Sequence, residues 1–431
     1  MMSRNSNSTI RAQTFCYAPG ILILSILSLT LTYAQTETIE KPGTAGQNTI
    51  VTEPERKLLL AALEALKPED IPKLTRDAEA GDNKSQWMLG GAYADGKVVP
   101  KDSGKYWSWI QKSAANGWPV GQSAVGIAYM KGEGVDRNPI EGVNWFRKAA
   151  DQGYAQAQAR LGTAYYLGIG VPRDPKEAVV WFRKAAEQEN PLGQFWLGNA
   201  YAEGQGIDKD VAQAVNWFRK AAEQGDAAAE YQLGRLYDNG QGASQDHAEG
   251  ARWYKKAAEH DLPIAQFDLA IDYHNGIGVP KNKDEAEKWF RKASDAGWAP
   301  ATYYLGRMYS DRNFQTSPQS GETAVKLFEK SAEQGYVMGA FVLSDIYSNR
   351  FLAYHLWISR DEARACHWLL VARELSKNDR WRADMPDDSA RAKAEVQKQV
   401  PKFKKNLKAG FASCEQSALD WVKAHPASSL P

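Results

Sequence analysis

The chain has 431 residues, of which 43% are hydrophobic and 24% are charged. This composition is ordinary for a folded protein and argues against both a largely disordered chain and a bundle of membrane-spanning helices. The 53 Lys and Arg residues nearly balance the 52 Asp and Glu residues, so the chain lacks the basic excess that is typical of nucleic-acid-binding proteins. No nucleic-acid partner is therefore expected.

The first 34 residues have the features of a secretory signal peptide. Arg4 and Arg11 supply positive charge, residues 21–33 form an apolar core, and Ala34 completes a site suited to a signal peptidase. The apolar core is too short for a membrane span, which takes about 20 residues; an uncleaved anchor is the alternative. We expect a mature chain without an integral membrane span, exported to the periplasm or, alternatively, secreted.

The mature chain is predicted to begin with a linker and two short helices. Residues 35–53 are polar and are predicted to be flexible. A helical pattern runs from Pro54 to Leu66, and a second one lies around Glu69 to Ala80. We interpret residues 54–81 as N-terminal capping helices.

A repeat of 36 residues dominates the rest of the chain. A tryptophan recurs at this spacing at Trp109, Trp145, Trp181, Trp217, Trp253 and Trp289. A leucine or valine keeps the same step at Leu89, Val125, Leu161, Leu197, Leu233, Leu269 and Leu305. A tyrosine does so at Tyr93, Tyr129, Tyr165, Tyr201, Tyr237, Tyr273 and Tyr309. Three series with one step establish a true repeat.

Each repeat is predicted to be a pair of helices joined by a glycine-rich turn. In residues 154–189, Leu161 and Tyr165 lie on one helical face, and residues 168–172 (GIGVP) end that first helix. Asp174 is a candidate cap for the second helix, with Pro175 at its first position. One such pair cannot bury its own apolar stripe, so neighbouring pairs must stack.

We count about eight repeats, in residues 82–377. The glycine that follows the leucine of the first helix, such as Gly162, is expected where the two helices cross closely. Residues 378–431 are predicted to form a C-terminal helical cap, with helices broken at Pro401.

These residues resemble the Sel1-like repeat family, a relative of the tetratricopeptide repeats. The pattern A-x-x-x-L-G-x-x-Y-x-x-G-x-G-V-x-x-D-x-x-x-A-x-x-W-F-x-K-A-A-x-x-G is seen best in residues 154–225. The resemblance implies an all-α, right-handed superhelical solenoid whose first helices line a concave side. It also implies an adaptor or scaffold role, often in bacterial envelopes.

A candidate partner-binding groove follows from positions of the first helix that share one face. One position is mostly aromatic, and the next position on that face varies freely between repeats. The middle of the groove is predicted to comprise Phe195, Asn199, Tyr231, Arg235, Phe267, Tyr303 and Arg307. Aromatic and arginine side chains dominate binding hot spots. Alternatively, the aromatic position packs between repeats, and only the variable position faces solvent.

Motifs for catalysis and metal binding are weak. Residues 91–98 (GAYADGKV) resemble a phosphate-binding loop but end in Val98 instead of a hydroxyl, and they lie within a repeat. The six histidines are scattered, so neither a metal nor a cofactor is expected. Cys366 and Cys414 suit a disulfide in an oxidising compartment; two separate buried thiols are the alternative.

The sequence therefore predicts a non-enzymatic scaffold of the cell envelope that binds a protein or peptide. The oligomeric state and the identity of the partner are left open. The alternative is an envelope enzyme or a peptidoglycan- or glycan-binding factor that acts through the C-terminal region. The basic stretch from Arg391 to Lys408 is interpreted as a solvated face of the cap, with docking on an anionic surface as its alternative.

Overall fold

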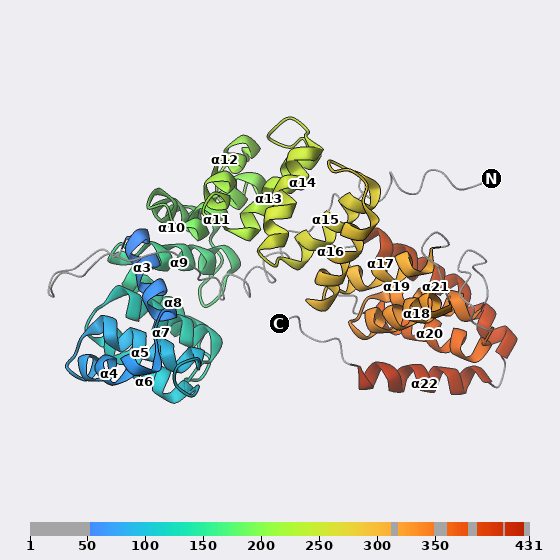
Figure 1. The fold of residues 1–431 in the computed structure, drawn as a ribbon, viewed down its shortest axis with the longest axis horizontal. Helices are drawn as coiled ribbons and strands as arrows, with labels where there is room; N and C mark the ends of the chain where they lie inside the picture. Colours follow the sequence, from blue (N-terminus) through green and yellow to red (C-terminus); the bar gives the residue numbers. More distant parts are fainter. Residues whose placement is uncertain (1–51, 312–317, 349–359, 378–385, 408–409, 426–431) are drawn as a thin grey trace. The chain divides into compact units, whose positions relative to one another are not determined.

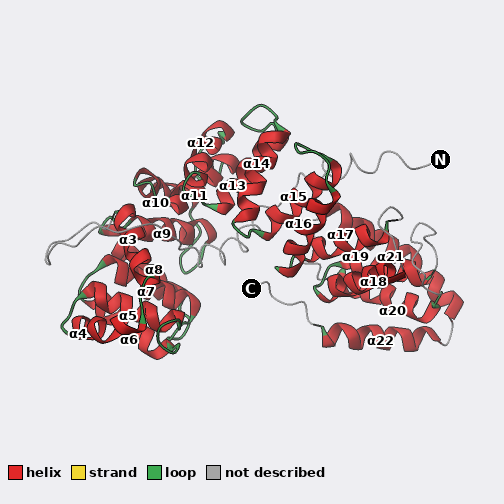
Figure 2. Ribbon diagram, in the orientation of Figure 1, coloured by secondary structure: helices red, strands yellow, loops and turns green. Residues whose placement is uncertain are grey.

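The computed structural model describes residues 52–311, 318–348, 360–377, 386–407 and 410–425. The predicted signal peptide and most of the predicted linker lie outside these residues. All regular secondary structure in the described residues is helical (Figures 1 and 2). The chain divides after Gln245 into two compact units. Each unit is described by itself below.

The N-terminal unit contains four complete helix pairs and the first helix of a fifth. Its helices are α3 (Glu53–Glu64), the short 3₁₀ helix η1 (Pro68–Asp70), α4 (Ile71–Glu79), α5 (Asn83–Asp95), α6 (Ser103–Ala115), α7 (Pro119–Lys131), α8 (Pro139–Asp151), α9 (Ala155–Leu167), α10 (Pro175–Glu187), α11 (Pro191–Glu203), α12 (Val211–Ala222) and α13 (Ala227–Asn239). The odd-numbered helices from α5 onward are the first helices of repeats, which we call A helices. Their even-numbered partners are the B helices.

The C-terminal unit continues the same alternation. Its helices are α14 (His247–Glu259), α15 (Pro263–Asn275), α16 (Lys283–Asp295), α17 (Ala299–Ser310), α18 (Pro318–Glu333), α19 (Val337–Tyr347), α20 (Glu362–Leu375), α21 (Pro386–Leu407) and α22 (Gly410–Ala424). Helices α14, α16, α18 and α20 are B helices, and α15, α17 and α19 are A helices. The last two helices follow the repeats. The predicted all-α solenoid of stacked helix pairs is confirmed.

The turn between the two helices of a repeat forms as the sequence predicts. Helix α9 ends at Gly168, which adopts the left-handed backbone conformation with φ of 73°. Residues other than glycine rarely adopt this conformation, which explains the glycine at this position. Helix α10 begins after Asp174, whose carboxylate accepts hydrogen bonds from the backbone N–H groups of Lys176 and Glu177. The predicted cap is confirmed, as is Pro175 in the first turn.

A glycine allows the two helices of a repeat to cross closely. A Cβ atom on Gly162 of α9 would lie 2.6 Å from Cδ1 of Phe182 in α10 and 3.1 Å from the backbone oxygen of Ala178. The equivalent glycines face the equivalent B-helix side chains at Gly90, Gly126, Gly198 and Gly306. The role that the sequence predicted for this glycine is confirmed.

Within each unit, a B helix that lies between two A helices packs against both of them, as α6, α8, α10, α12, α16 and α18 do. In the N-terminal unit α10 packs on both α9 and α11, and Leu161 and Phe182 at this junction are completely buried. Direct contact between successive A helices, as between α9 and α11, is more extensive than between successive B helices of the described chain. In the N-terminal unit, the A helices therefore lie on the inner side of the stack.

The recurring tryptophan of the B helices is covered by a lysine one turn further on. Lys112, Lys148, Lys184, Lys220, Lys256 and Lys292 place their ammonium groups 3.9 to 4.6 Å from the ring centroid of the tryptophan three residues earlier. Such cation–π contacts contribute about 0.5–1 kcal/mol each at exposed sites. The B-helix surface thus shields a large apolar ring with a charge that stays in water.

The C-terminal cap differs from its prediction at Pro401. Pro401 lies inside the continuous helix α21 instead of breaking it. A proline removes one backbone hydrogen bond, and the carbonyl group it leaves unpaired can bond water when that side of the helix is exposed. Pro401 is exposed, whereas Val396 and Phe403 on the opposite side of α21 are buried. The basic side chains Arg391, Lys393, Lys398, Lys402, Lys404 and Lys405 are exposed.

Helix α22 is attached to α20 by contacts of four kinds. Cys366 and Cys414 form a disulfide with a Cα–Cα distance of 6.2 Å. Arg373 forms an ion pair of 2.9 Å with Glu415, and the ring of Trp368 lies edge-on to that of Trp421. His367 Nδ1 lies 2.9 Å from Ser417 Oγ. The disulfide links residues 48 positions apart, so it restricts a long loop of the unfolded chain.

Filling the close crossing should destabilise the stack. We expect Gly162→Val to lower the free energy of unfolding by about 1–3 kcal/mol, because the new methyl groups would force α9 and α10 apart. Thermal unfolding followed by circular dichroism measures this. The matched control is Gly104→Val on α6, where an added Cβ meets only Asp102 Oδ1 at 3.4 Å. Equal melting temperatures for the two variants would contradict the packing argument.

Removing the disulfide should loosen the C-terminal cap. We expect Cys366→Ala/Cys414→Ala to cost about 2–4 kcal/mol, because the unfolded chain regains the freedom of the closed loop. Hydrogen exchange of α22 would report the loss. Reductant should reproduce it in the unmodified chain and leave the double variant unchanged. Equal exchange in the oxidised, reduced and variant chains would contradict a stabilising role.

Candidate functional site

Three of the predicted groove residues of the N-terminal unit lie in the core. Phe195 of α11 is 1% exposed and packs on Phe218 of α12, with ring centroids 5.8 Å apart. Asn199 is also buried, and its amide donates a hydrogen bond to the backbone oxygen of Phe195. Tyr231 of α13 is likewise 1% exposed. The aromatic position therefore faces the interior of the stack in this unit.

The C-terminal unit repeats this arrangement. Phe267 of α15 and Tyr303 of α17 are buried. Phe267 packs on Phe290, and Tyr303 packs on Phe328 and Tyr336, with ring centroids 5.4 to 5.8 Å apart. Buried rings of this kind contribute packing energy and geometric order rather than contact with a partner. This is the arrangement that the alternative interpretation of the sequence describes.

The arginines at the variable position lie over these rings. The Arg307 guanidinium is 5.9 Å from the ring centroid of Tyr303 and 5.6 Å from that of Tyr304. Arg307 is exposed. Arg235 is half-buried, 6.0 Å from the ring of Tyr231, and donates a hydrogen bond to Gln232 Oε1. A guanidinium stacked on an aromatic ring loses less freedom on binding than a freely rotating one. The predicted site thus offers oriented arginines above buried rings.

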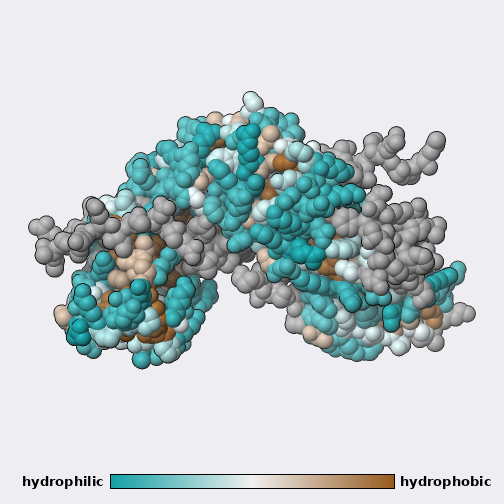
Figure 3. Space-filling model, viewed as in Figure 1, coloured by the Kyte–Doolittle hydropathy of each residue, from teal (hydrophilic) through white to brown (hydrophobic). Residues whose placement is uncertain are grey.

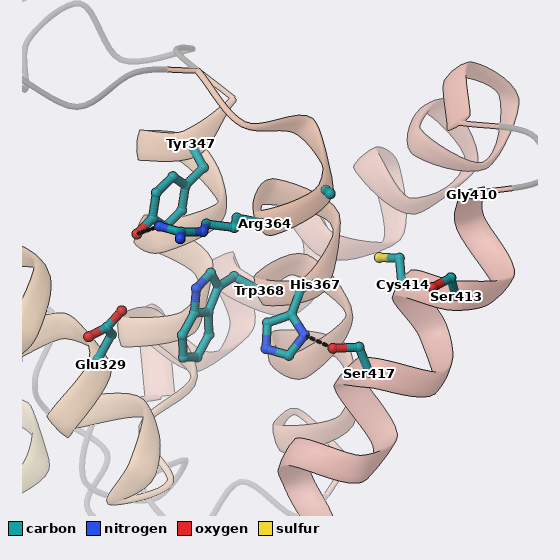
Figure 4. A pocket seen from close by; sticks show the side chains of 10 residues that line it. Glu329, Tyr347, Arg364, His367, Trp368, Gly410, Ser413, Cys414 and Ser417 are labelled. Carbon is teal, nitrogen blue, oxygen red and sulfur yellow. Dashed lines mark hydrogen bonds between the residues drawn. The ribbon is translucent and has the colours of Figure 1, made fainter.

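A second candidate site is a cleft in the C-terminal unit, between α20 and α22. It has a volume of about 670 Å³ and is lined by Glu329, Tyr347, Ala363, Arg364, His367, Trp368, Gly410, Ser413, Cys414 and Ser417. Figure 4 shows Tyr347 and Arg364 side by side on one wall. His367 of α20 faces Ser417 of α22 across the cleft. Aromatic walls with a few convergent polar groups are typical of ligand sites.

Two titratable groups of this cleft are shifted by their surroundings. Burial, reinforced by the negative charge of Glu333, raises the pKa of Glu329. Burial lowers the pKa of His367, so its imidazole is neutral near pH 7 and can accept or donate a hydrogen bond. Arg364 lies 5.4 Å from the ring centroid of Tyr347. The cleft therefore combines a fixed cation, a neutral imidazole and aromatic surface.

Sequence reasoning missed this cleft because it forms between distant segments. Tyr347 belongs to the repeat series, but Arg364 and Ser417 lie on two helices that the sequence does not place side by side. The two cysteines are the one sequence signal that joins these helices. Pairing Cys366 with Cys414 brings His367 and Ser417 to neighbouring turns of α20 and α22.

The described residues contain neither a metal-binding cluster nor a membrane-spanning helix. Within the described residues, no three His, Cys, Asp or Glu side chains lie close enough together to hold a metal ion. None of the described helices is both long enough and apolar enough to cross a bilayer.

Comparison with known proteins supports the repeat assignment. The model of the Sel1 repeat matches residues 83–118, 119–154, 155–190, 191–226, 227–262, 263–298, 299–336 and 346–376. Among curated proteins, none matches the chain.

Several solved structures are similar to the chain. A Sel1 repeat protein of Oxalobacter formigenes is 31% identical, with a TM-score of 0.49, and the match covers 53% of this chain and all of the other. A protective antigen of uropathogenic Escherichia coli is 25% identical, with a TM-score of 0.44, and the match covers 84% of this chain and 98% of the other. An immunity protein of Pseudomonas aeruginosa is 23% identical, with a TM-score of 0.34, over 55% of this chain and 83% of the other.

The family assignment rests on the eight matched repeats, which begin at residue 83 and end at residue 376. Each of the first seven, up to residue 336, contains a pair of helices. The chain belongs to the Sel1 repeat family.

Proposed function

We propose that this chain is a non-enzymatic scaffold that binds a protein or peptide partner through its A helices in the cell envelope. Sel1 repeat proteins generally mediate protein–protein interaction, and the family is typically non-catalytic. The observation that best supports the A helices as the binding side is the exposed Arg307, held over Tyr303 and Tyr304.

The proposed contact surface comprises the variable positions, supported by the aromatic ones. Arg235 and Arg307 would contact the partner, and Asn199 lies at the same position of an earlier repeat. The rings of Phe195, Tyr231, Phe267 and Tyr303 would fix the backbone beneath them. Arginine suits this role because its guanidinium donates several hydrogen bonds in a fixed geometry to carboxylate or backbone oxygens.

Replacing the two arginines should weaken partner capture. We expect Arg235→Ala/Arg307→Ala to reduce the affinity for the captured partner at least about tenfold, because hot-spot arginines contribute 1 kcal/mol or more each. Affinity capture with the tagged chain from envelope extract, followed by titration of the captured protein, measures this.

A matched control changes two arginines on B helices. Arg183→Ala/Arg252→Ala removes the same charge from exposed positions of α10 and α14. Both double variants should keep the helical signal and melting temperature of the unmodified chain. If both capture the partner equally well, the A helices are not the binding side.

The cleft between α20 and α22 favours a second candidate function, binding of a peptidoglycan fragment or another glycan. Its aromatic walls and its hydrogen-bonding groups are features that glycan sites combine. We expect Arg364→Ala to weaken binding of a soluble muropeptide about tenfold, measured by calorimetry, whereas Lys377→Ala at the end of α20 should have no effect. Absence of binding to the unmodified chain would exclude this function, and turnover of the muropeptide would indicate an enzyme.

A further inference from the structure

The cleft between α20 and α22 holds two opposite charges that do not pair with each other. Glu329 of α18 and Arg364 of α20 both line it. Figure 4 shows the Glu329 carboxylate beside the indole of Trp368 and the Arg364 guanidinium above that indole. Within the described residues, the ion-pair partner of Arg364 is Asp361, not Glu329. Both charges therefore remain available to a ligand in the cleft.

The carboxylate of Glu329 has no partner of its own. Glu329 is half-buried, and within the described part of the chain it accepts no hydrogen bond and forms no ion pair. Burial and the charge of Glu333 raise its pKa, and they outweigh the opposite effect of Arg364 and Lys326. A carboxylate that is partly removed from water without a partner is costly, so a ligand cation beside Glu329 would be stabilised.

The guanidinium of Arg364 is oriented but not fully used. Its Nη1 donates a hydrogen bond of 3.4 Å to the hydroxyl of Tyr347, and its Nε lies 3.4 Å from Oδ2 of Asp361. An arginine carries five N–H donors, so these two contacts leave the donors of Nη2 for a ligand. Arg364 is also exposed. A carboxylate can therefore reach a cation whose position is already fixed.

The rest of the cleft suits a small polar ligand. The indole of Trp368 gives one apolar surface, whereas Ser413 and Ser417 on α22 are exposed hydroxyls. The side of α22 that Figure 3 presents is mostly hydrophilic. His367 uses Nδ1 towards Ser417, which leaves its Nε2 for a ligand. A volume of about 670 Å³ holds a small molecule or the end of a short peptide.

We propose that this cleft binds a zwitterionic amino-acid group, in which an ammonium and a carboxylate are attached to the same carbon atom. The carboxylate binds Arg364, the ammonium binds Glu329, and the aliphatic part packs on Trp368. A simple anion would leave Glu329 without a partner, and a simple cation would leave the Nη2 donors of Arg364 unused. A zwitterion satisfies both groups.

This inference deepens the second candidate function and rests on it. A peptidoglycan fragment consists of a glycan and a stem peptide, and a diamino acid in that peptide can carry a free zwitterionic end. The two charges of the cleft would then recognise the peptide, and the sugar would lie outside this contact. The part of the fragment that determines affinity is therefore the stem peptide.

The test compares three soluble muropeptides that share the same disaccharide and the same first two stem residues. The first ends in diaminopimelate, whose free end carries an ammonium and a carboxylate. The second ends in lysine, which has the ammonium without that carboxylate. The third is the first with its free ammonium acetylated. Calorimetry measures the affinity of each for the unmodified chain, for Arg364→Ala and for Glu329→Gln.

Two further variants serve as matched controls. Lys377→Ala removes an exposed cation just after α20, and Glu322→Gln removes an exposed carboxylate from α18. Neither residue lines the cleft. Circular dichroism of all four variants checks that the helical signal and the melting temperature are unchanged.

The expected result is a preference for the diaminopimelate muropeptide in which each charge has its own reader. The unmodified chain and both controls should bind it about tenfold more tightly than either of the others, because each of those lacks one charge-assisted contact. Arg364→Ala should bind the diaminopimelate and lysine forms equally and still discriminate against the acetylated form. Glu329→Gln should show the reverse pattern.

Equal affinity of the unmodified chain for the three muropeptides would overturn the proposal, and this comparison decides even if a variant fails to fold. A preference that survives in both Arg364→Ala and Glu329→Gln would refute the assignment of the two charges. If the disaccharide alone binds as tightly as the muropeptides, the glycan function stands and only this inference falls. If neither the disaccharide nor any muropeptide binds, the second candidate function falls together with it.

Discussion

The whole structure depends on the inability of one helix pair to bury its own apolar stripe. Leu161 and Phe182 are completely buried only because a neighbouring repeat covers them. The close crossing at Gly162 sets how near the two layers of helices lie. Each repeat must therefore present the same apolar pattern to the next, and this requirement produces the 36-residue series of leucine, tyrosine and tryptophan.

This constraint separates the positions that maintain the fold from those that can bind a partner. The stack restricts the leucine, glycine and mostly aromatic positions of the A helices to residues that fit the core, so these positions are less free to vary with the partner. The position of Gly91, Ile127, Arg235 and Arg307 varies in size and charge between repeats. A repeat scaffold can thus change its partner by changing one position per repeat while the core stays the same.

The two ends of the solenoid meet a different demand, because an end repeat has a neighbour on one side only. At the C-terminal end, α22 attaches to α20 through the disulfide and the pair of Trp368 and Trp421, and a cleft forms between the two helices. At the other end, α4 packs on α5, and α3 contacts α5 where Leu63 lies over Gly91. Helix α22, which is not part of any repeat, thus completes a cleft whose other residues come from repeat helices.

The sequence alone determined the helix pairs, their turns and their caps, because these features depend on residues close together in the chain. Gly168 ends α9, and Asp174 and Pro175 begin α10, through contacts with residues only a few positions away. The stacking follows from the periodic apolar pattern. Only the tertiary structure decided which face of an A helix is buried, because a core stripe and a binding stripe have the same helical spacing. That is why Phe195 and Tyr303 lie beneath the surface and Arg307 lies on it. Tertiary contacts also placed α3 against Gly91 and Gln224 and kept α21 continuous at Pro401, since both outcomes depend on surroundings contributed by distant segments.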